Sequence, residues 1–302
     1  MTKDESRYEV WSATPTPMTQ DLRVDEGSVK RMVEHHVGHG VQGVFIGGTC
    51  GEGPVMPRVS LRELTRWSVA AAAGRLQVAV QTTDNSAARV LGNIREARDD
   101  GADVAVVAEP WFSAPRVSSS YLRDHYLRIA EESVLPVGLY VRTVSMDTPD
   151  YREILNHRNV CMIKDSSLDV RIQGTALSVV REREDLRILT GYEWDVLSYL
   201  RAGYSGILAG GAILTGGLLV RLVAAFGGGD EAAAAELERT SIEVLHTAYG
   251  GPSIGSWLTG LKYTLVKMGV FATSAGYLEY PLPDEVARGI ERMVEQGIGG
   301  EK

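Results

Sequence analysis

Residues 41–52 read VQGVFIGGTCGE, a short apolar run that passes directly into a loop of small residues. The run Val41–Ile46 is rich in β-branched side chains and too short for a helix, so it predicts a strand buried on both faces. The stretch Ser28–His39 before it has helical periodicity, with a capping residue, Asp25, ahead of it and Gly40 at its end. A helix that leads into a buried strand indicates one unit of a parallel α/β fold.

The same alternation recurs along the whole chain. Further helices are predicted to start at Ser60 and Ser86 and to stop at Gly74 and Gly101. Eight units, without a G-x-G-x-x-G motif after the first strand, favour a closed (β/α)8 TIM barrel over an open doubly wound sheet. The eight predicted strands are Tyr8–Ala13, Val41–Ile46, Leu76–Val80, Val104–Val107, Val137–Tyr140, Val160–Lys164, Leu186–Thr190 and Ser205–Leu208.

The chain continues beyond the eighth strand. Three glycines at 227–229 precede an alanine-rich helical pattern from Glu231 to about His246, and two more amphipathic stretches reach Glu295. We therefore expect a barrel over residues 1–226 and a C-terminal helical extension, packed on the barrel, over residues 227–302.

Charge and composition exclude several classes of function. The 302 residues carry a formal net charge of −8, which gives no overall positive field for nucleic acid or anionic lipid, although a local basic pocket for a small anion remains compatible with it. No apolar stretch approaches the length of a membrane span, and residues 1–10 lack the apolar core of a signal peptide. We expect a cytoplasmic protein. Its two cysteines, Cys50 and Cys161, form neither a disulfide framework nor a C-x-x-C motif.

Active sites of TIM barrels lie at the carboxyl ends of the strands, and one lysine falls there. Lys164 closes the apolar run that begins at Val160. Apolar surroundings favour the neutral amine, which attacks a ketone carbon to form a Schiff base. The alternative is a lysine that caps its strand and pairs with Asp165, and position alone does not separate the two.

Two other strand ends carry groups that suit the same chemistry. Tyr140 ends the strand before that of Lys164, so its phenol is a candidate for passing protons, although a buried structural tyrosine is the commoner meaning. The small-residue loop 47–51 offers backbone N–H groups to an anion, with the side chains of Thr49 and Cys50 beside them. Such a loop alone is a weak signal.

Taken together, these motifs resemble the dihydrodipicolinate synthase and N-acetylneuraminate lyase family. The order and spacing of the motifs match over nearly the whole chain. The matching segments are Ala13–Pro15, Gly40–Gly43, Gly48–Glu52, Gln81–Ser86, Pro110–Phe112, Leu139–Tyr140, Ile163–Ser166 and Gly206–Ile207.

The resemblance implies a function and a role for each motif. Lys164 would form the imine with pyruvate or a related small 2-oxo acid, Tyr140 and Thr49 would relay protons, and the loop residues Gly48, Cys50 and Gly51 would hold the carboxylate. The segment from Gly203 to Gly211, with Gly206 and Ile207, would be a backbone wall of the imine pocket. Lyase, aldolase and dehydratase reactions all remain open. The resemblance implies no metal or nucleotide cofactor, and it implies a homotetramer built from two dimers.

Three positions depart from the family pattern. Cys50 stands where a second threonine is usual, and a thiol is the weaker donor. Trp111 and Phe112 replace a tyrosine pair, one member of which relays protons across a subunit interface in synthases of the family. The segment Val141–Ser145 replaces a pattern whose arginine binds the carboxylate of the second substrate. Arg142 is a candidate to supply the missing charge, but it is displaced along the loop, and an exposed loop arginine is the commoner interpretation.

These departures argue against a standard lysine-pathway synthase and leave a rival hypothesis open. In the rival, the barrel is catalytically retired and binds a 2-oxo acid or sugar acid as a sensor or assembly subunit. One further cluster, His35, His36 and His39, has spacing compatible with a metal site. We interpret it as ordinary helix surface at the amino-terminal face of the barrel, which is the wrong side for catalysis.

Overall fold

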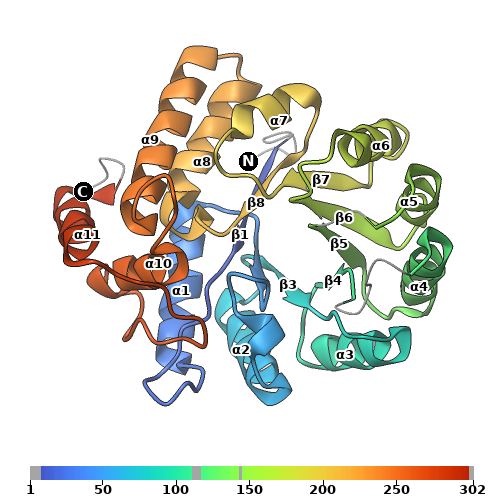
Figure 1. Ribbon diagram of the computed structural model, residues 1–302, viewed down its shortest axis with the longest axis horizontal. Coiled ribbons are helices and arrows are strands. Elements are labelled where there is room, and N and C mark those ends of the chain that lie inside the picture. Colours follow the sequence, from blue (N-terminus) through green and yellow to red (C-terminus); the bar gives the residue numbers. More distant parts are fainter. Residues whose placement is uncertain (1–7, 111–116, 143–144, 299–302) are drawn as a thin grey trace.

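The protein is described here by a computed structural model that covers residues 8–110, 117–142 and 145–298. Its centre is a closed barrel of eight parallel strands, in which each strand pairs with the next in sequence and β1 pairs with β8 (Figure 1). The predicted TIM barrel is thereby confirmed. The strands are β1 Glu9–Ala13, β2 Gly43–Ile46, β3 Gln77–Gln81, β4 Val104–Ala108, β5 Val137–Val141, β6 Val160–Asp165, β7 Arg187–Thr190 and β8 Gly206–Ala209.

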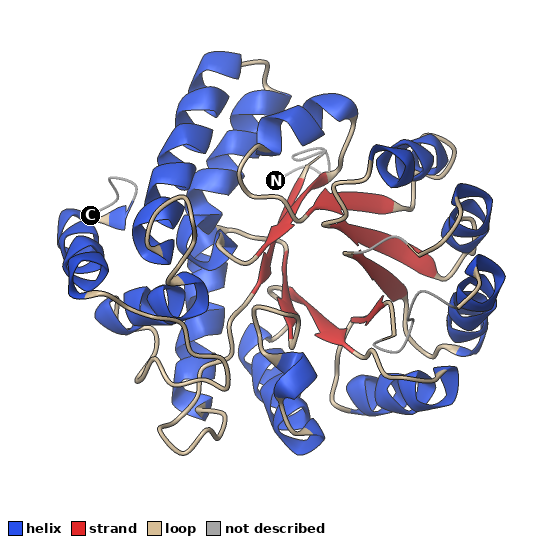
Figure 2. Ribbon diagram, in the orientation of Figure 1, coloured by secondary structure: helices blue, strands red, loops and turns tan. Residues whose placement is uncertain are grey.

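Helices form a ring around the strands, so that the sheet is covered on its outer side (Figure 2). A single turn of 3-10 helix, η1 Gly53–Val55, follows the loop after β2. The helices of the ring are α1 Glu26–His39, α2 Arg58–Ala72, α3 Ala87–Asp99, α4 Ser119–Glu132, α5 Thr148–Leu155, α6 Val170–Val180, α7 Val196–Ala202 and α8 Ala212–Gly227.

The predicted helix boundaries can be compared with the observed caps. Asp25 accepts a hydrogen bond from Gly27 N at 3.2 Å and Ser86 accepts one from Arg89 N at 3.3 Å, so both predicted starts are confirmed. The start at Ser60 is wrong. Helix α2 begins earlier, at Arg58, because Pro57 supplies a backbone angle suited to entering a helix without any side-chain cap.

Alternation along the strands separates two sets of side chains. One set points into the barrel and includes Trp11, Phe45, Tyr140 and Leu208, whereas the other faces the surrounding helices. The interior at the start of the strands is polar, because Arg187 pairs there with the carboxylate of Glu9, at 3.0 Å. At the opposite end, the interior opens toward the loops that follow the strands.

The chain beyond α8 is helical. It forms α9 Glu231–Tyr249, α10 Trp257–Lys267 and α11 Asp284–Gln296, which lie together at one side of the barrel beside α1 and α8 (Figure 1). Apolar residues of α9 and α10 share a buried cluster with Ile213 and Leu218 of α8. We retain the division at residues 226 and 227 as a proposal. No helix in the described segments has the length and apolar character that crossing a membrane requires.

The three histidines of α1 are not ordinary helix surface, so that interpretation is wrong. His36 is fully buried, and His35 and His39 are half-buried, because α8 packs against α1. His35 Nε2 lies 2.8 Å from the carbonyl oxygen of Ile213, and His36 Nδ1 lies 2.7 Å from that of Met32. In the described part of the chain no cluster of three or more His, Cys, Asp or Glu side chains is arranged to hold a metal ion.

Candidate active site

Lys164 lies on the interior face of the barrel at the carboxyl end of β6, with only 6% of its surface exposed. Its ammonium nitrogen Nζ is 4.5 Å from the centre of the Tyr140 ring and 5.3 Å from that of Phe45. Asp165 faces the other way, and its carboxylate accepts a hydrogen bond from the Tyr204 hydroxyl. Within the described residues Lys164 makes no ion pair with Asp165, so the strand-cap alternative is not what the structure has.

Tyr140 stands opposite Lys164 in the pairing of β5 with β6. Its hydroxyl lies 3.4 Å from Thr49 Oγ1, and the guanidinium carbon of Arg142 lies 5.3 Å from the centre of its ring. Burial by itself raises the pKa of Tyr140. The charge of Lys164, the hydrogen bond with Thr49 and the charge of Arg142 outweigh burial and hold this pKa below its usual value. A phenol in this state exchanges its proton more readily than a free one.

The loop after β2 is packed so tightly that it requires glycine. A Cβ atom on Gly48 would lie 2.7 Å from a ring carbon of Phe45, and one on Gly51 would lie 2.8 Å from the backbone nitrogen of Gly47. The carbonyl oxygen of Gly51 accepts a hydrogen bond from the hydroxyl of Thr16, at 2.6 Å. These contacts fix the loop beside Phe45, which also borders Lys164.

Two backbone N–H groups in this loop are available to a ligand. Those of Thr49 and Cys50 donate to no other residue in the described part of the chain. The Cys50 side chain packs against Gly210 and joins an apolar cluster with Leu245. Burial, together with the charge of Glu193, raises the pKa of the Cys50 thiol to about 12, so the group stays a neutral thiol. The side chain of Cys50 therefore belongs to the apolar core.

A buried ion pair ties this loop to the C-terminal helices. Glu52 follows the loop with a left-handed backbone angle φ of 59° and has no exposed surface. Its carboxylate pairs with the ammonium of Lys262 on α10 and accepts a hydrogen bond from Leu278 N, at 2.8 Å. Lys262 also donates to the carbonyl oxygen of Ala275, at 2.9 Å. A Cβ atom at position 276 would lie 2.7 Å from Lys262 Nζ and 2.8 Å from a carboxylate oxygen of Glu52, so Gly276 leaves room for this ion pair.

Glu193, a residue that sequence reasoning missed, also belongs to this end of the barrel. It lies in the loop after β7, and its carboxylate accepts hydrogen bonds from Gly211 N, at 2.8 Å, and from the Tyr249 hydroxyl, at 3.1 Å. Burial raises its pKa, although both hydrogen bonds and the charge of Lys164 oppose the shift. Its place three residues after Thr190, the last residue of a predicted strand, was the signal that would have found it.

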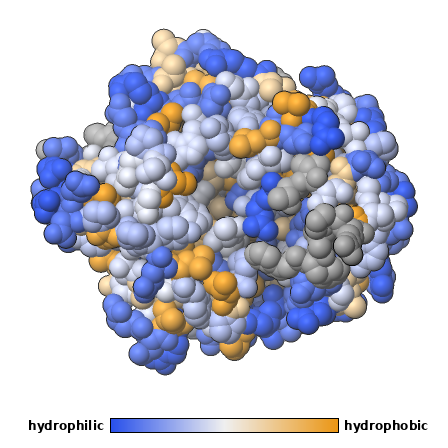
Figure 3. Space-filling view, in the orientation of Figure 1, coloured by the Kyte–Doolittle hydropathy of each residue, from blue (hydrophilic) through white to orange (hydrophobic). Residues whose placement is uncertain are grey.

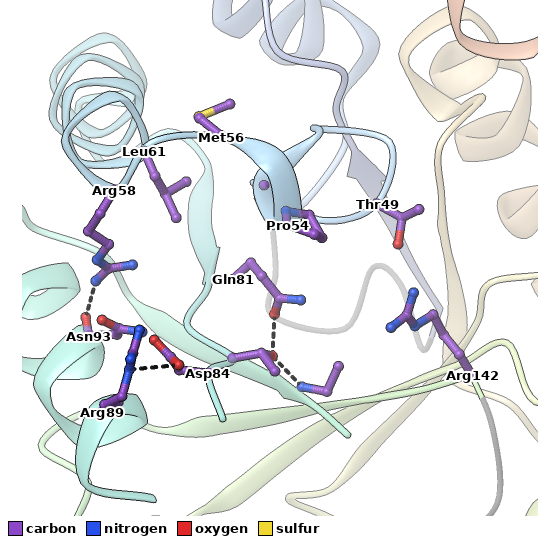
Figure 4. A pocket seen from close by; sticks show the side chains of 13 residues that line it. Thr49, Pro54, Met56, Arg58, Leu61, Gln81, Asp84, Arg89, Asn93 and Arg142 are labelled. Atoms are coloured by element: carbon purple, nitrogen blue, oxygen red, sulfur yellow. Dashed lines mark hydrogen bonds and ion pairs between the residues drawn. The ribbon is translucent and has the colours of Figure 1, made fainter. Parts of the chain in front are cut away.

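A cavity of about 300 Å³ opens beside the Thr49 hydroxyl. Figure 3 shows a hollow near the centre of the visible face, over the ring of strands drawn in Figure 1. The cavity lining is shown in Figure 4, where Thr49 and Arg142 lie on one side and Arg58 and Arg89 on the other. Arg142, a predicted substrate-binding residue, therefore borders both Tyr140 and this cavity.

Comparison with known proteins agrees with this geometry. The sequence model of the dihydrodipicolinate synthetase family matches residues 7–283. The chain belongs to this family. Similar proteins include the 4-hydroxy-tetrahydrodipicolinate synthases of Listeria innocua, 24% identical over 91% of this chain and 92% of that one, and of Moorella thermoacetica, 29% identical over 76% and 79%.

Solved structures of family members have the same fold. Dihydrodipicolinate synthase from Bacteroides thetaiotaomicron superposes with a TM-score of 0.86, at 24% identity, covering 98% of this chain and 100% of that one. A prophage protein of the family from E. coli K12, in complex with pyruvate, gives a TM-score of 0.84 at 20% identity, covering 96% and 98%.

The structure does not bring every predicted site residue of this family member together. Gly206 is paired with Glu9 at the start of the strands, and the side chain of Ile207 packs outward against the helices. Leu208, the next residue, faces the interior together with Tyr140. Gly206 and Ile207 were predicted to contribute through their backbone, and that role stays a prediction. Phe112, also predicted to contact substrate, lies outside the described residues.

Proposed function

We propose that the protein is a Schiff-base-forming lyase or aldolase that acts on pyruvate or a related small 2-oxo acid, and that it differs from a standard dihydrodipicolinate synthase. The observation that carries the proposal is the burial of Lys164 beside Tyr140, whose hydroxyl contacts Thr49 in the loop after β2. Membership of the family supports a lyase. The departures at Cys50, at Trp111–Phe112 and at Val141–Ser145 support a second substrate other than that of the synthases.

In the proposed reaction the loop first binds the carboxylate of the 2-oxo acid through the N–H groups of Thr49 and Cys50. The ammonium of Lys164 first loses a proton to solvent, and the resulting amine attacks the ketone carbon while a proton passes from its nitrogen to the ketone oxygen, which gives a carbinolamine. Loss of the carbinolamine oxygen as water leaves the imine. Tyr140 gives a proton to the departing oxygen and recovers one from Lys164 nitrogen, with the Thr49 hydroxyl as its hydrogen-bond partner.

The imine then serves as an electron sink for the adjacent carbon. In the condensation direction, loss of a proton from that carbon gives an enamine, which adds to an aldehyde. In the cleavage direction, breaking of the carbon–carbon bond at that carbon releases an aldehyde and leaves the same enamine. No metal or dissociable cofactor enters this scheme. A homotetramer with Trp111 and Phe112 at an interface stays a prediction of the family resemblance.

Reductive trapping tests this proposal. Incubation with a panel of 2-oxo acids and borohydride should convert the imine into a stable secondary amine on the protein, and pyruvate should be among the acids that are trapped. The Lys164→Met variant should trap none of them. If the wild-type protein fails to trap any 2-oxo acid in the panel, the proposal is wrong. Imine formation with no turnover of any acid, with or without added aldehydes, would instead favour the retired barrel.

A further inference from the structure

Glu193 is an acidic residue near Lys164 that the proposed reaction does not use. Its carboxylate accepts hydrogen bonds from Gly211 N, at 2.8 Å, and from the Tyr249 hydroxyl, at 3.1 Å. Gly211 immediately precedes α8 and Tyr249 ends α9, two helices that pack against each other beside the barrel (Figure 1). A negative charge at the amino end of a helix is favourable by itself. A cap for α8 is therefore the simplest interpretation of Glu193.

The position of Glu193 relative to Lys164 points to a second role. Lys164 on β6 stands opposite Leu189 on β7, and Glu193 lies in the loop that follows β7. Burial raises the pKa of Glu193, and the charge of Lys164 opposes that shift. Both charges also act on the Cys50 thiol, since burial and Glu193 raise its pKa whereas Lys164 lowers it. Glu193 and Lys164 therefore lie near each other at the carboxyl end of the strands.

Two glycines between β8 and α8 hold the Glu193 carboxylate in this place. A Cβ atom on Gly211 would lie 2.8 Å from Glu193 Oε2 and 2.3 Å from Cδ2 of Leu245 on α9. A Cβ atom on Gly210 would lie 3.2 Å from Cys50 Sγ. Because this turn carries no side chains, it passes between Glu193 and the loop after β2. The carboxylate is thus fixed by contacts from three sides.

The other acidic groups around Lys164 are differently engaged. Asp165 faces away from the barrel interior and accepts a hydrogen bond from Tyr204. Glu52 is paired with Lys262, and Cys50 stays a neutral thiol. Further ionisable groups on the elements around Lys164 and Glu193 are Tyr140 on β5 with Arg142 beside it, and Tyr249 and His246 on α9, of which His246 stacks on Trp194.

We propose that Glu193 is a positioning residue that acts through Lys164. Its carboxylate supplies the negative charge that stabilises the Lys164 ammonium before the reaction and the protonated imine after it. The effect on the imine rests on the proposed function. The effect on the ammonium involves no substrate, so the two parts can be tested separately.

Reductive methylation tests the effect on the ammonium without any 2-oxo acid. The protein receives a short pulse of formaldehyde and cyanoborohydride at pH 8, and mass spectrometry gives the ratio of methylation at Lys164 to that at the exposed Lys30. Only the neutral amine reacts. Glu193→Gln keeps an acceptor oxygen for Gly211 but removes the charge, so Lys164 should lose its proton more readily. The ratio should rise about threefold or more over wild type.

Control variants separate this effect from the loss of a helix cap. Glu238→Gln removes a half-buried carboxylate of α9 that accepts a hydrogen bond from Leu197 N, at 2.8 Å, at the start of α7. Tyr249→Phe removes one hydrogen bond of Glu193 and leaves its charge. Both should lower the urea midpoint and keep the methylation ratio within about 1.5-fold of wild type.

Two results would overturn the proposal. One is a ratio in Glu193→Gln equal to that of wild type, and the other is an equal rise in Glu238→Gln. Glu193→Asp and Glu193→Asn give the same comparison with a shorter side chain, should Glu193→Gln fail to fold. The aspartate variant should keep a ratio closer to wild type than the asparagine variant does.

Pyruvate trapping on the same proteins tests the effect on the imine. Glu193→Gln should need about threefold more pyruvate or more for half-maximal trapping, because the protonated imine loses its counter-charge, whereas Glu238→Gln should need the wild-type amount. An unchanged requirement in Glu193→Gln would refute this part of the proposal. If wild type traps no 2-oxo acid, the proposed function is wrong, and the methylation ratio still decides whether Glu193 is the counter-charge of Lys164.

Discussion

Tyr140 is the residue on which proton transfer in the proposed reaction depends. It faces Lys164 across two paired strands and contacts Thr49 through its hydroxyl. The adjacent charges hold its pKa below the usual value, which suits a group that both gives and takes a proton.

Removal of the Tyr140 hydroxyl should therefore slow imine formation without preventing it. We expect Tyr140→Phe to lower the rate of pyruvate trapping by about a hundredfold, the usual scale for loss of a positioned acid or base. Thr49→Val should also slow trapping, and Thr49→Ser should restore most of the rate. Tyr151→Phe is the matched control, because Tyr151 is fully buried and its hydroxyl has no partner among the described residues. Trapping by Tyr140→Phe at the wild-type rate would refute this role.

The sequence predicted some residues of the candidate site and missed others. Lys164 and Tyr140 were found because each ends an apolar run, and the structure sets them side by side. Glu193 was missed although it lies three residues after the end of a predicted strand, because that position was its only signal in the sequence. The sequence also did not show that the side chain of Leu208, rather than that of Ile207, faces the interior, since both are apolar and only the pleat of the strand distinguishes them.

At the scale of elements, the loop after β2 depends on a distant helix. Glu52 and Lys262 are both almost completely buried, and each is the counter-charge of the other. Burial lowers the pKa of Lys262, and the charge of Glu52 opposes that shift. The pair therefore couples the C-terminal helices to the loop whose backbone is proposed to hold the substrate carboxylate.

Breaking this pair should damage both stability and binding. Lys262→Met leaves a buried carboxylate without its counter-charge, which lowers the free energy of unfolding by about 3–5 kcal/mol. The double variant E52Q/K262M should recover much of that loss, and both variants should need more pyruvate for half-maximal trapping.

Lys267→Met, in the exposed pair of α10 with Glu291, is the control and should change neither quantity appreciably. Urea denaturation and trapping titrations measure the two effects. Wild-type behaviour of Lys262→Met in both would contradict the coupling.

The elements themselves were largely predictable from the sequence. All eight strands were placed within two residues of their observed bounds, because a strand buried on both faces is a continuous apolar run. The start of α2 was misplaced because Pro57 begins that helix without a side-chain cap. The ion pair of Glu52 with Lys262 was not predictable, since 210 residues separate the two in sequence.

At the scale of the whole molecule, the burial of α1 makes stability sensitive to acid. Burial, together with the charges of His35 and His39, lowers the pKa of His36 to about 3, although its hydrogen bond with Met32 opposes the shift. Burial and the charge of His35 lower the pKa of His39 to about 4. The sequence did not reveal that these histidines are buried, because the helix that covers them, α8, lies far along the chain.

The lowered pKa values of His36 and His39 make the folded protein less stable in acid. An unfolded histidine takes up a proton near pH 6.5, but folded His36 resists protonation until about pH 3. The unfolded state therefore binds more protons, and stability is lost as the pH falls from about 6.5 toward 3. Replacement of His36 by leucine should reduce the acid slope of the unfolding free energy by up to about 1.4 kcal/mol per pH unit, measured by urea denaturation between pH 7 and pH 4. An unchanged slope would contradict the assignment.

The proposed reaction depends on one covalent bond at Lys164. After incubation with pyruvate and borohydride, peptide mapping by mass spectrometry should show one modified peptide, the one that contains Lys164, with the mass of pyruvate joined through a reduced imine. Lys164→Met should remain unmodified under the same conditions. An unmodified wild-type protein, or a label on any other lysine, would contradict Schiff-base formation at Lys164.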